Sequence, residues 1–212
     1  MANVSRVNGF RPVKHLNGSP YNGQANIYEV PAGEAIPVFI GDLVKLSANA
    51  GTAGYPVCMS VSTATTAIAG NAAVAIVGCV VGVFNNKVDV DGNMTTGSVS
   101  LDIPIYRPAS TKQFVLVADA PDLIFEAQAD ASVALADVGM NADVNSAAQA
   151  AGGGTGASYQ GVSTTAPSTT ATRPLQIVGI SKKVDNESAS AYNKVLVRIN
   201  THQYGAAGLA GL

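Results

Sequence analysis

Residues that could do chemistry are few in this sequence and lie far apart. Only two histidines occur among the 212 residues, His15 and His202. A Ser-His-Asp triad needs its serine on a strained turn, and the chain contains no Gly-x-Ser-x-Gly element. Paired carboxylates such as Asp119 and Asp122 fit a polar turn, where aspartate bonds to nearby backbone. The sequence therefore predicts no catalytic residue and no enzyme.

Three segments could suggest a bound ion or nucleotide, but each has a simpler explanation. Asp89 to Asn93 begins like a calcium loop, yet its glycine stands at the fourth position instead of the sixth, so an Asp-Gly turn is expected. The glycine-rich stretch 151–156 lacks the Gly-Lys-Ser/Thr ending of a phosphate loop. Cys58 and Cys79 lack zinc-site spacing, and we interpret them as reduced and buried. We expect no metal and no cofactor.

Composition excludes further classes of protein. Charged residues make up 12% of the chain and the net charge is −2, so a basic surface for nucleic acid is not expected. The longest apolar run, Ala72 to Phe84, is too short for a membrane helix and contains two glycines. The first residues show no signal-peptide pattern, so we expect the protein to stay in the cytoplasm where it is made.

The elements that would position any site are short and β-rich. No helical period separates them, which predicts an all-β fold, a single β-barrel or β-sandwich domain over 38–204. The clearest hairpin is expected over Phe114 to Glu126, with its turn at Asp119 to Asp122. Residues 131–140 fit either a short helix or an acidic turn with a strand. The predicted strands are Val38–Leu46, Val57–Val61, Val74–Phe84, Phe114–Ala118, Leu123–Ala127, Leu175–Ile180 and Val195–Ile199.

Three regions differ from this strand pattern. Residues 1–37 carry turn signals and scattered apolar residues, which predicts an extended N-terminal arm. Residues 144–172 are rich in Gly, Thr and Ala, which predicts a long loop or hairpin tip inserted in the domain. Residues 205–212 are small and predict a flexible tail.

The arm is basic and the middle of the chain is acidic. Arg6, Arg11 and Lys14 precede the first acidic residue, whereas residues 113–172 contain six acids and no Lys or Arg. We expect the arm to cross this acidic region, on another copy or on the same chain. A solvated acidic face is the alternative. The acids expected to meet an arm are Asp119, Asp122, Glu126 and Asp130.

Three stretches together resemble a family. They are residues 9–23, residues 107–126, and residues 182–187 followed by 194–204. In combination they resemble tailed-phage virion structural proteins, most like a capsid decoration (cement) protein. Nothing in 144–172 shares in this resemblance.

The resemblance implies a structural virion protein that binds the outer surface of a tailed-phage capsid and stabilises the shell. Its partners would be the major capsid protein and copies of itself, as a homotrimer or alternatively a dimer. The alternatives are a phage tail or head-to-tail connector component, or a receptor- or glycan-binding module that uses the 144–172 loop. The arm is the expected attachment element, and its expected contact residues are Phe10, Arg11, Lys14, His15, Tyr21 and Tyr28.

Overall fold

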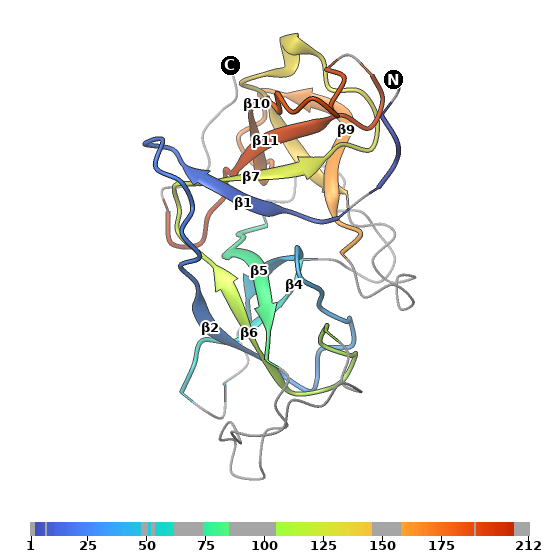
Figure 1. Ribbon diagram of the computed structural model, residues 1–212. Helices are drawn as coiled ribbons and strands as arrows, with labels where there is room; N and C mark the ends of the chain where they lie inside the picture. Colours follow the sequence, from blue (N-terminus) through green and yellow to red (C-terminus); the bar gives the residue numbers. More distant parts are fainter. Residues whose placement is uncertain are drawn as a thin grey trace.

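The protein folds into two antiparallel β-sheets. The computed structural model describes residues 3–6, 8–47, 51, 54–61, 74–84, 105–145, 158–188 and 190–205. The six-stranded sheet A has the order β1-β7-β11-β10-β8-β9, and the five-stranded sheet B has the order β2-β6-β5-β3-β4. Figure 1 shows sheet A in the upper half of the molecule and sheet B in the lower half. The all-β prediction is confirmed.

The bounds of the strands follow. Sheet A contains β1 (Arg11–His15), β7 (Leu123–Gln128), β8 (Asn141–Asn145), β9 (Gly161–Ser168), β10 (Leu175–Ile180) and β11 (Lys194–Ile199). Sheet B contains β2 (Asn26–Val30), β3 (Leu43–Leu46), β4 (Cys58–Ser60), β5 (Gly78–Val83) and β6 (Gln113–Ala118). Between β7 and β8, a short 3-10 helix, η1 (Leu135–Asp137), occupies the region expected as a helix or an acidic turn.

The predicted hairpin over Phe114 to Glu126 is wrong, although both of its strands exist. Strand β6 pairs with β2 and β5 in sheet B, whereas β7 pairs with β1 and β11 in sheet A. All six residues of β7 and five of the six in β6 are buried, so each strand is an interior strand with neighbours on both sides. The turn between them therefore carries the chain from one sheet to the other.

Isolated bridges connect strands that are not neighbours in either sheet. In sheet B, Glu29 of the edge strand β2 bridges to Val57, the residue before the other edge strand β4. In sheet A, Val162 of the edge strand β9 bridges to Ala129, the residue after β7. Neither sheet is closed into a barrel, so the barrel that the sequence allowed is not formed.

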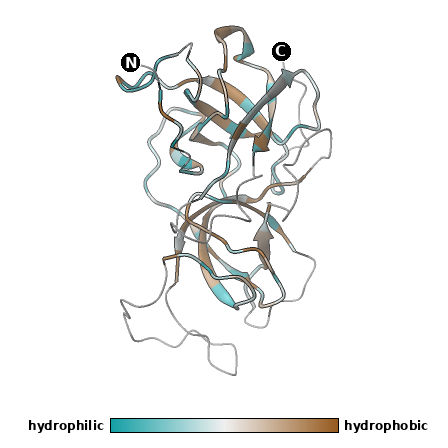
Figure 2. Ribbon diagram, turned by 90° about the vertical axis from the view of Figure 1, so that its right-hand side faces the viewer, coloured by the Kyte–Doolittle hydropathy of each residue, from teal (hydrophilic) through white to brown (hydrophobic). Residues whose placement is uncertain are grey.

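The two sheets share one hydrophobic core. Leu43, Cys79 and Ala118 of the sheet B region pack in the same cluster as Phe125 and Val197 of sheet A. A second, smaller cluster lies within sheet B around Val44, Val80 and Val115. Hydrophobic residues follow the strands of both sheets in Figure 2. Cys58 and Cys79 are both buried and free, as interpreted from the sequence.

The segments predicted as arm and loop contribute strands. Strand β1 lies at one edge of sheet A, and β2 lies at one edge of sheet B. Strand β9 pairs with β8, so residues 161–168 are a strand and not a loop, because Val, Thr and Ser are compatible with a strand between partly buried faces. Residues 144–145 of the predicted loop belong to β8, and residues 158–160 and 169–172 lie outside the strands. Its residues 146–157 lie outside the described residues, as do Asp89–Asn93 and the tail beyond Gly205.

A junction near Gly9 ties three distant segments together. The Phe10 N–H donates to the Gly41 carbonyl at 2.8 Å, and the Leu43 N–H donates to the Gln160 Oε1 at 2.7 Å. The Gln160 N–H in turn donates to the Ser158 hydroxyl at 3.1 Å. This junction holds the N-terminal segment, the start of β3 and the start of β9 side by side.

Asp42 at this junction makes the stability depend on pH. Burial raises the pKa of Asp42 from 3.8 to about 7, although hydrogen bonds from Ser158 and Phe39 oppose the shift. The folded protein then keeps a proton that the unfolded chain has lost, so its free energy of unfolding falls as pH rises from about 4 to about 7.

We expect Asp42→Asn to remove this loss. The asparagine amide cannot ionise, so the free energy of unfolding of the variant should not fall over this pH range. Relative to the natural protein, the variant should become more stable by up to about 4 kcal/mol as the pH rises from about 4 to about 7. Urea denaturation at about pH 4.5 and about pH 7.5 measures the difference. Equal pH dependence in the two proteins would contradict the assignment.

Candidate functional site

The predicted arm residues divide into buried and accessible groups. Phe10 and Tyr28 are each only 1% exposed and belong to the hydrophobic clusters of their own chain, and Tyr21 packs against one of those clusters. Arg11 is exposed, and Lys14 is partly exposed. The aromatic residues therefore stabilise this chain, and the basic ones remain available to a partner.

The N-terminal segment contacts the acidic region of its own chain. In the register of β1 with β7, Arg11 lies opposite Glu126. The His15 Nδ1 lies 3.0 Å from the Asp122 Oδ1, and the Leu16 N–H donates to the Asp122 carbonyl. This is the second of the two arrangements expected from the charges. Contact with the acidic region of another copy stays a prediction.

The four acids have different hydrogen-bond partners. Asp119 accepts hydrogen bonds from Tyr28, whereas Asp130 accepts them from the Thr164 hydroxyl and N–H. The structure thus engages each acid with a different neighbour, which the sequence could not show.

Glu126 has the strongest ionic environment of the four. It accepts hydrogen bonds at 2.7 Å from both the Lys183 ammonium and the Ser181 hydroxyl. Burial opposes ionisation of this carboxyl, but these two bonds and the charge of Lys183 outweigh it and lower the pKa of Glu126. The carboxylate therefore stays charged and holds the 181–183 segment against β7.

An exposed surface forms on β1 and the residue that follows it. Val13 is 41% exposed and Leu16 is 54% exposed, and they are accompanied by Arg11 and Lys14. We call these four residues the β1 surface. Exposed aliphatic groups beside cationic side chains are suited to a partner that offers an apolar patch with acidic groups at its rim.

The backbone edge of β1 is partly covered by the chain itself. The His15 N–H donates to the Ser19 carbonyl, and the Tyr21 N–H donates to the Val13 carbonyl. Pro12 has no N–H to offer, which is a common way to blunt an edge strand. Recognition at the β1 surface would therefore use side chains more than strand addition.

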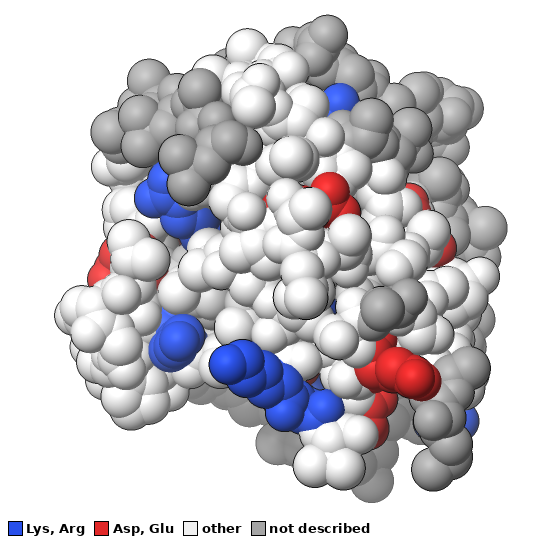
Figure 3. All heavy atoms as spheres, turned by 90° about the horizontal axis from the view of Figure 1, so that it is seen from above, with Lys and Arg blue, Asp and Glu red and all other residues white. Residues whose placement is uncertain are grey.

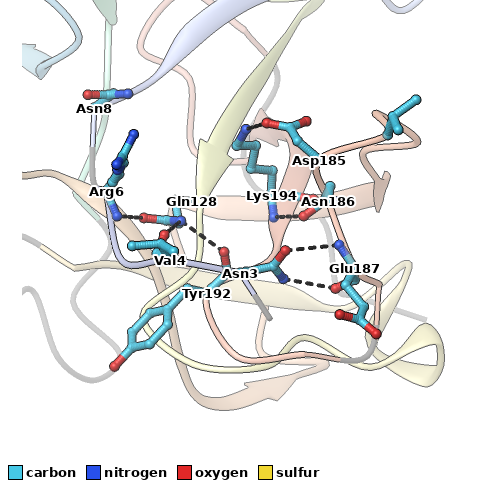
Figure 4. Close-up of a pocket in the computed structure, with 11 residues that line it drawn as sticks. Asn3, Val4, Arg6, Asn8, Gln128, Asp185, Asn186, Glu187, Tyr192 and Lys194 are labelled. Atoms are coloured by element: carbon cyan, nitrogen blue, oxygen red, sulfur yellow. Dashed lines mark hydrogen bonds and ion pairs between the residues drawn. The ribbon is translucent and has the colours of Figure 1, made fainter. Parts of the chain in front are cut away.

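A cavity of about 690 Å³ lies between the N-terminal segment and residues 184–187, beside the end of β7 and the start of β11. The Asn3 side chain donates to the Glu187 carbonyl and accepts from the Glu187 N–H, both at 2.9 Å, as Figure 4 shows. The Gln128 amide accepts from the Arg6 N–H at 2.7 Å. These bonds hold the N-terminal segment on the body of the protein.

The walls of this cavity carry both charges and apolar groups. Asp185 and Lys194 form an ion pair at 2.6 Å, while Val4 and Val184 are strongly exposed. Tyr192 has a φ of 61°, a strained value for a residue with a side chain, and its carbonyl accepts from Gln128. Sequence reasoning missed this cavity because its polar residues come from segments that are far apart in the chain.

Figure 3 shows the end of the molecule above sheet A, where uncharged residues dominate the described surface. In the described ranges no cluster of three or more His, Cys, Asp or Glu could hold a metal ion. No helix in the described part of the chain is long and apolar enough to cross a membrane.

No family model matches this chain, and neither the curated proteins nor the solved structures contain a match.

Proposed function

We propose that this chain is a structural protein of a tailed-phage particle, which binds the outer surface of the capsid and stabilises the shell. Its partners would be the major capsid protein and further copies of itself. The observation that carries the proposal is the placement of the three stretches that resemble such proteins. They include β1, most of β7 and β11, which are consecutive neighbours in sheet A, and also β6 in sheet B. Segments far apart in the sequence thus lie side by side in sheet A.

The physical properties of the chain support this role. A protein that binds only the assembled shell stabilises it by mass action, as any ligand selective for one state does. Weak contacts per copy suffice when copies are linked in a trimer or dimer, because linked contacts raise avidity. The low charge of the chain, 12% of residues, limits repulsion between neighbouring copies. We further propose a sandwich-like packing of the two sheets, with the β1 surface facing the shell.

Capsids that lack this protein provide the test of location. Purified protein is mixed with them, and bound copies are counted by sedimentation and located by cryo-electron microscopy. Many equivalent copies across the outer shell support the decoration role. A single ring at one vertex assigns the chain to the connector, and no binding contradicts both virion assignments and favours the receptor- or glycan-binding alternative.

We expect the double variant Arg11→Glu/Lys14→Glu to bind capsids at least about tenfold more weakly, because it reverses the charge of the β1 surface. Point variants are preferable to deletion of the N-terminal segment, since β1 is part of sheet A. Lys45→Glu on β3 in sheet B is the control, and its binding should match that of the natural protein. An equal loss in both variants would contradict the assignment of the β1 surface.

A further inference from the structure

An open groove of about 720 Å³ lies beside β2, on the sheet B side of the turn that joins the sheets. Its polar and aromatic wall consists of Asn26 and Tyr28 from β2, Asp119 from the turn, Tyr55 before β4, and Tyr204 after β11. Tyr55 is 38% exposed and Tyr204 is 52% exposed. Four separate segments therefore converge on one place, and two of their aromatic rings are open to a ligand.

The hydrogen bonds in this groove have a defined direction. The Tyr28 hydroxyl donates to the Asp119 Oδ2 at 2.7 Å, which uses its only proton. The Tyr204 hydroxyl lies 3.3 Å from the Tyr28 hydroxyl and so acts as the donor in that pair. The Asn26 Nδ2 lies 3.0 Å from each oxygen of Asp119. The groups that remain for a ligand are lone pairs on Asp119 and Tyr204, which are acceptors.

Tyr28 is well suited to the role of fixed donor. Burial, together with its hydrogen bonds to Tyr204 and Asp119, raises the pKa of Tyr28 far above its ordinary value. The hydroxyl therefore stays protonated at any physiological pH and keeps Asp119 in place as a carboxylate directed at the groove.

The charge of Asp119 is not balanced locally. The described lining of the groove contains no lysine or arginine, and no ion pair in the described part of the chain includes Asp119. His202 lies beside the groove, where its ring packs against Tyr204. Burial lowers the pKa of His202, so it is neutral at physiological pH. The described lining of the groove thus carries a net negative charge.

We propose that this groove binds the side chain of an arginine that projects from a partner protein chain. A guanidinium group donates several hydrogen bonds, lacks acceptors, and stacks on aromatic rings, so it complements a wall that offers a carboxylate, acceptor oxygens and open tyrosine rings. A lysine ammonium matches the charge but not the planar stacking. The proposal deepens the proposed function, since it rests on that function for the origin of the partner, which would be the capsid or a second copy.

The binding chemistry can be tested without capsids. A capped tripeptide with a central arginine is titrated into the full-length protein, and the tyrosine ring signals are followed by nuclear magnetic resonance. We expect saturable shifts for Tyr55 and Tyr204, with a dissociation constant on the order of 1 mM, as befits one anchor residue. The same peptide with citrulline, a neutral isostere of arginine, should bind at least about tenfold more weakly.

Two variants locate the interaction in the groove. Asp119→Asn removes the charge, and Tyr55→Ala removes an exposed ring without touching the hydrogen bonds of Asp119. We expect each variant to weaken arginine binding at least about threefold. Tyr192→Ala is the matched control because Tyr192 is 37% exposed and lies outside the groove.

The outcomes separate this proposal from the others. Equal binding of the arginine and citrulline peptides, or binding of a neutral oligosaccharide with the same ring shifts, would overturn the proposal in favour of a site for uncharged ligands. Arginine binding by a protein that fails to bind capsids would refute the virion role but leave the groove assigned. Capsid binding by a protein that shows no response to the arginine peptide would refute the arginine site in the groove but leave the virion role supported.

Discussion

We expect Arg107→Met to lower the free energy of unfolding by about 3–5 kcal/mol. The Arg107 side chain is fully buried, and its guanidinium donates to four backbone carbonyls, those of Pro31, Glu34, Ile36 and Thr111, at 2.6–2.8 Å. Methionine has a similar length but no donor, so these carbonyls would lose their partner inside the protein. Urea denaturation measures the change directly.

The charge of Arg107 persists at physiological pH. Burial lowers the pKa of Arg107 to about 10, so the guanidinium remains protonated and makes charge-assisted hydrogen bonds. The bonds connect the segment after β2 with the segment before β6, whose backbones also meet in the bridge between Val38 and Arg107. One side chain thus replaces the regular backbone pairing that this part of sheet B lacks.

Arg198→Met provides the matched control. Arg198 is partly exposed and donates one side-chain hydrogen bond at 2.7 Å, to the Gln176 Oε1. We expect this variant to lose at most about 1 kcal/mol. Similar losses in the two arginine variants would show that the four carbonyl contacts of Arg107 contribute little.

The second large effect is expected for Gly9→Ala, which should cost about 3 kcal/mol. Gly9 has a φ of +72°, and a Cβ there would lie 2.5 Å from the Gly41 carbonyl oxygen and 2.6 Å from the Ser158 Cβ. The obstacle is partly backbone, so it cannot move aside by a change of rotamer. Thermal and urea denaturation should both show the loss.

Gly23→Ala separates the cost of the positive φ from the cost of the steric contact made by the added Cβ. Gly23 has a similar φ of +87°, but a Cβ there would have no heavy atom within 4 Å, so only the backbone conformation is penalised. We expect this variant to cost about 1 kcal/mol. Equal losses at the two glycines would refute close packing at the junction.

The strands that the sequence predicted are those with continuous apolar runs. Val57–Val61, Val74–Phe84, Phe114–Ala118, Leu123–Ala127, Leu175–Ile180 and Val195–Ile199 contain β4, β5, β6, β7, β10 and β11, give or take one residue, and β3 lies at the end of Val38–Leu46. Such apolar runs must be buried. A chain with few charged residues cannot provide the solvent-exposed face of many helices, so the runs are expected to form buried strands.

Four strands had no such signal. Strands β1, β2, β8 and β9 contain residues such as Pro12, Asn26, Asp143 and Ser163, and their partners supply the stability that their own composition does not. Asp143 of β8, for example, forms an ion pair at 3.0 Å with Arg173, which lies between β9 and β10. Local propensity cannot show a contact made with a residue so far away in the chain.

The candidate contact residues were also predicted only in part from the sequence. The sequence identified Arg11, Lys14 and Asp119 as candidate contact residues, because the basic and acidic residues are segregated along the chain. It did not show that Phe10 and Tyr28 are buried in their own chain, or that Tyr55 and Tyr204 join Asp119 in one groove. Those outcomes depend on contacts between segments from opposite ends of the protein.

Composition and apolar runs by themselves determined that this protein is built from β-strands, because these properties act on neighbouring residues and require no knowledge of the fold. Only the tertiary structure decided that Asp119 to Asp122 joins two sheets and not two strands of a hairpin. A turn with the same residues serves either purpose, and the choice depends on which strands offer hydrogen-bonding partners to β6 and β7. That competition involves the whole chain, so no local pattern could predict it.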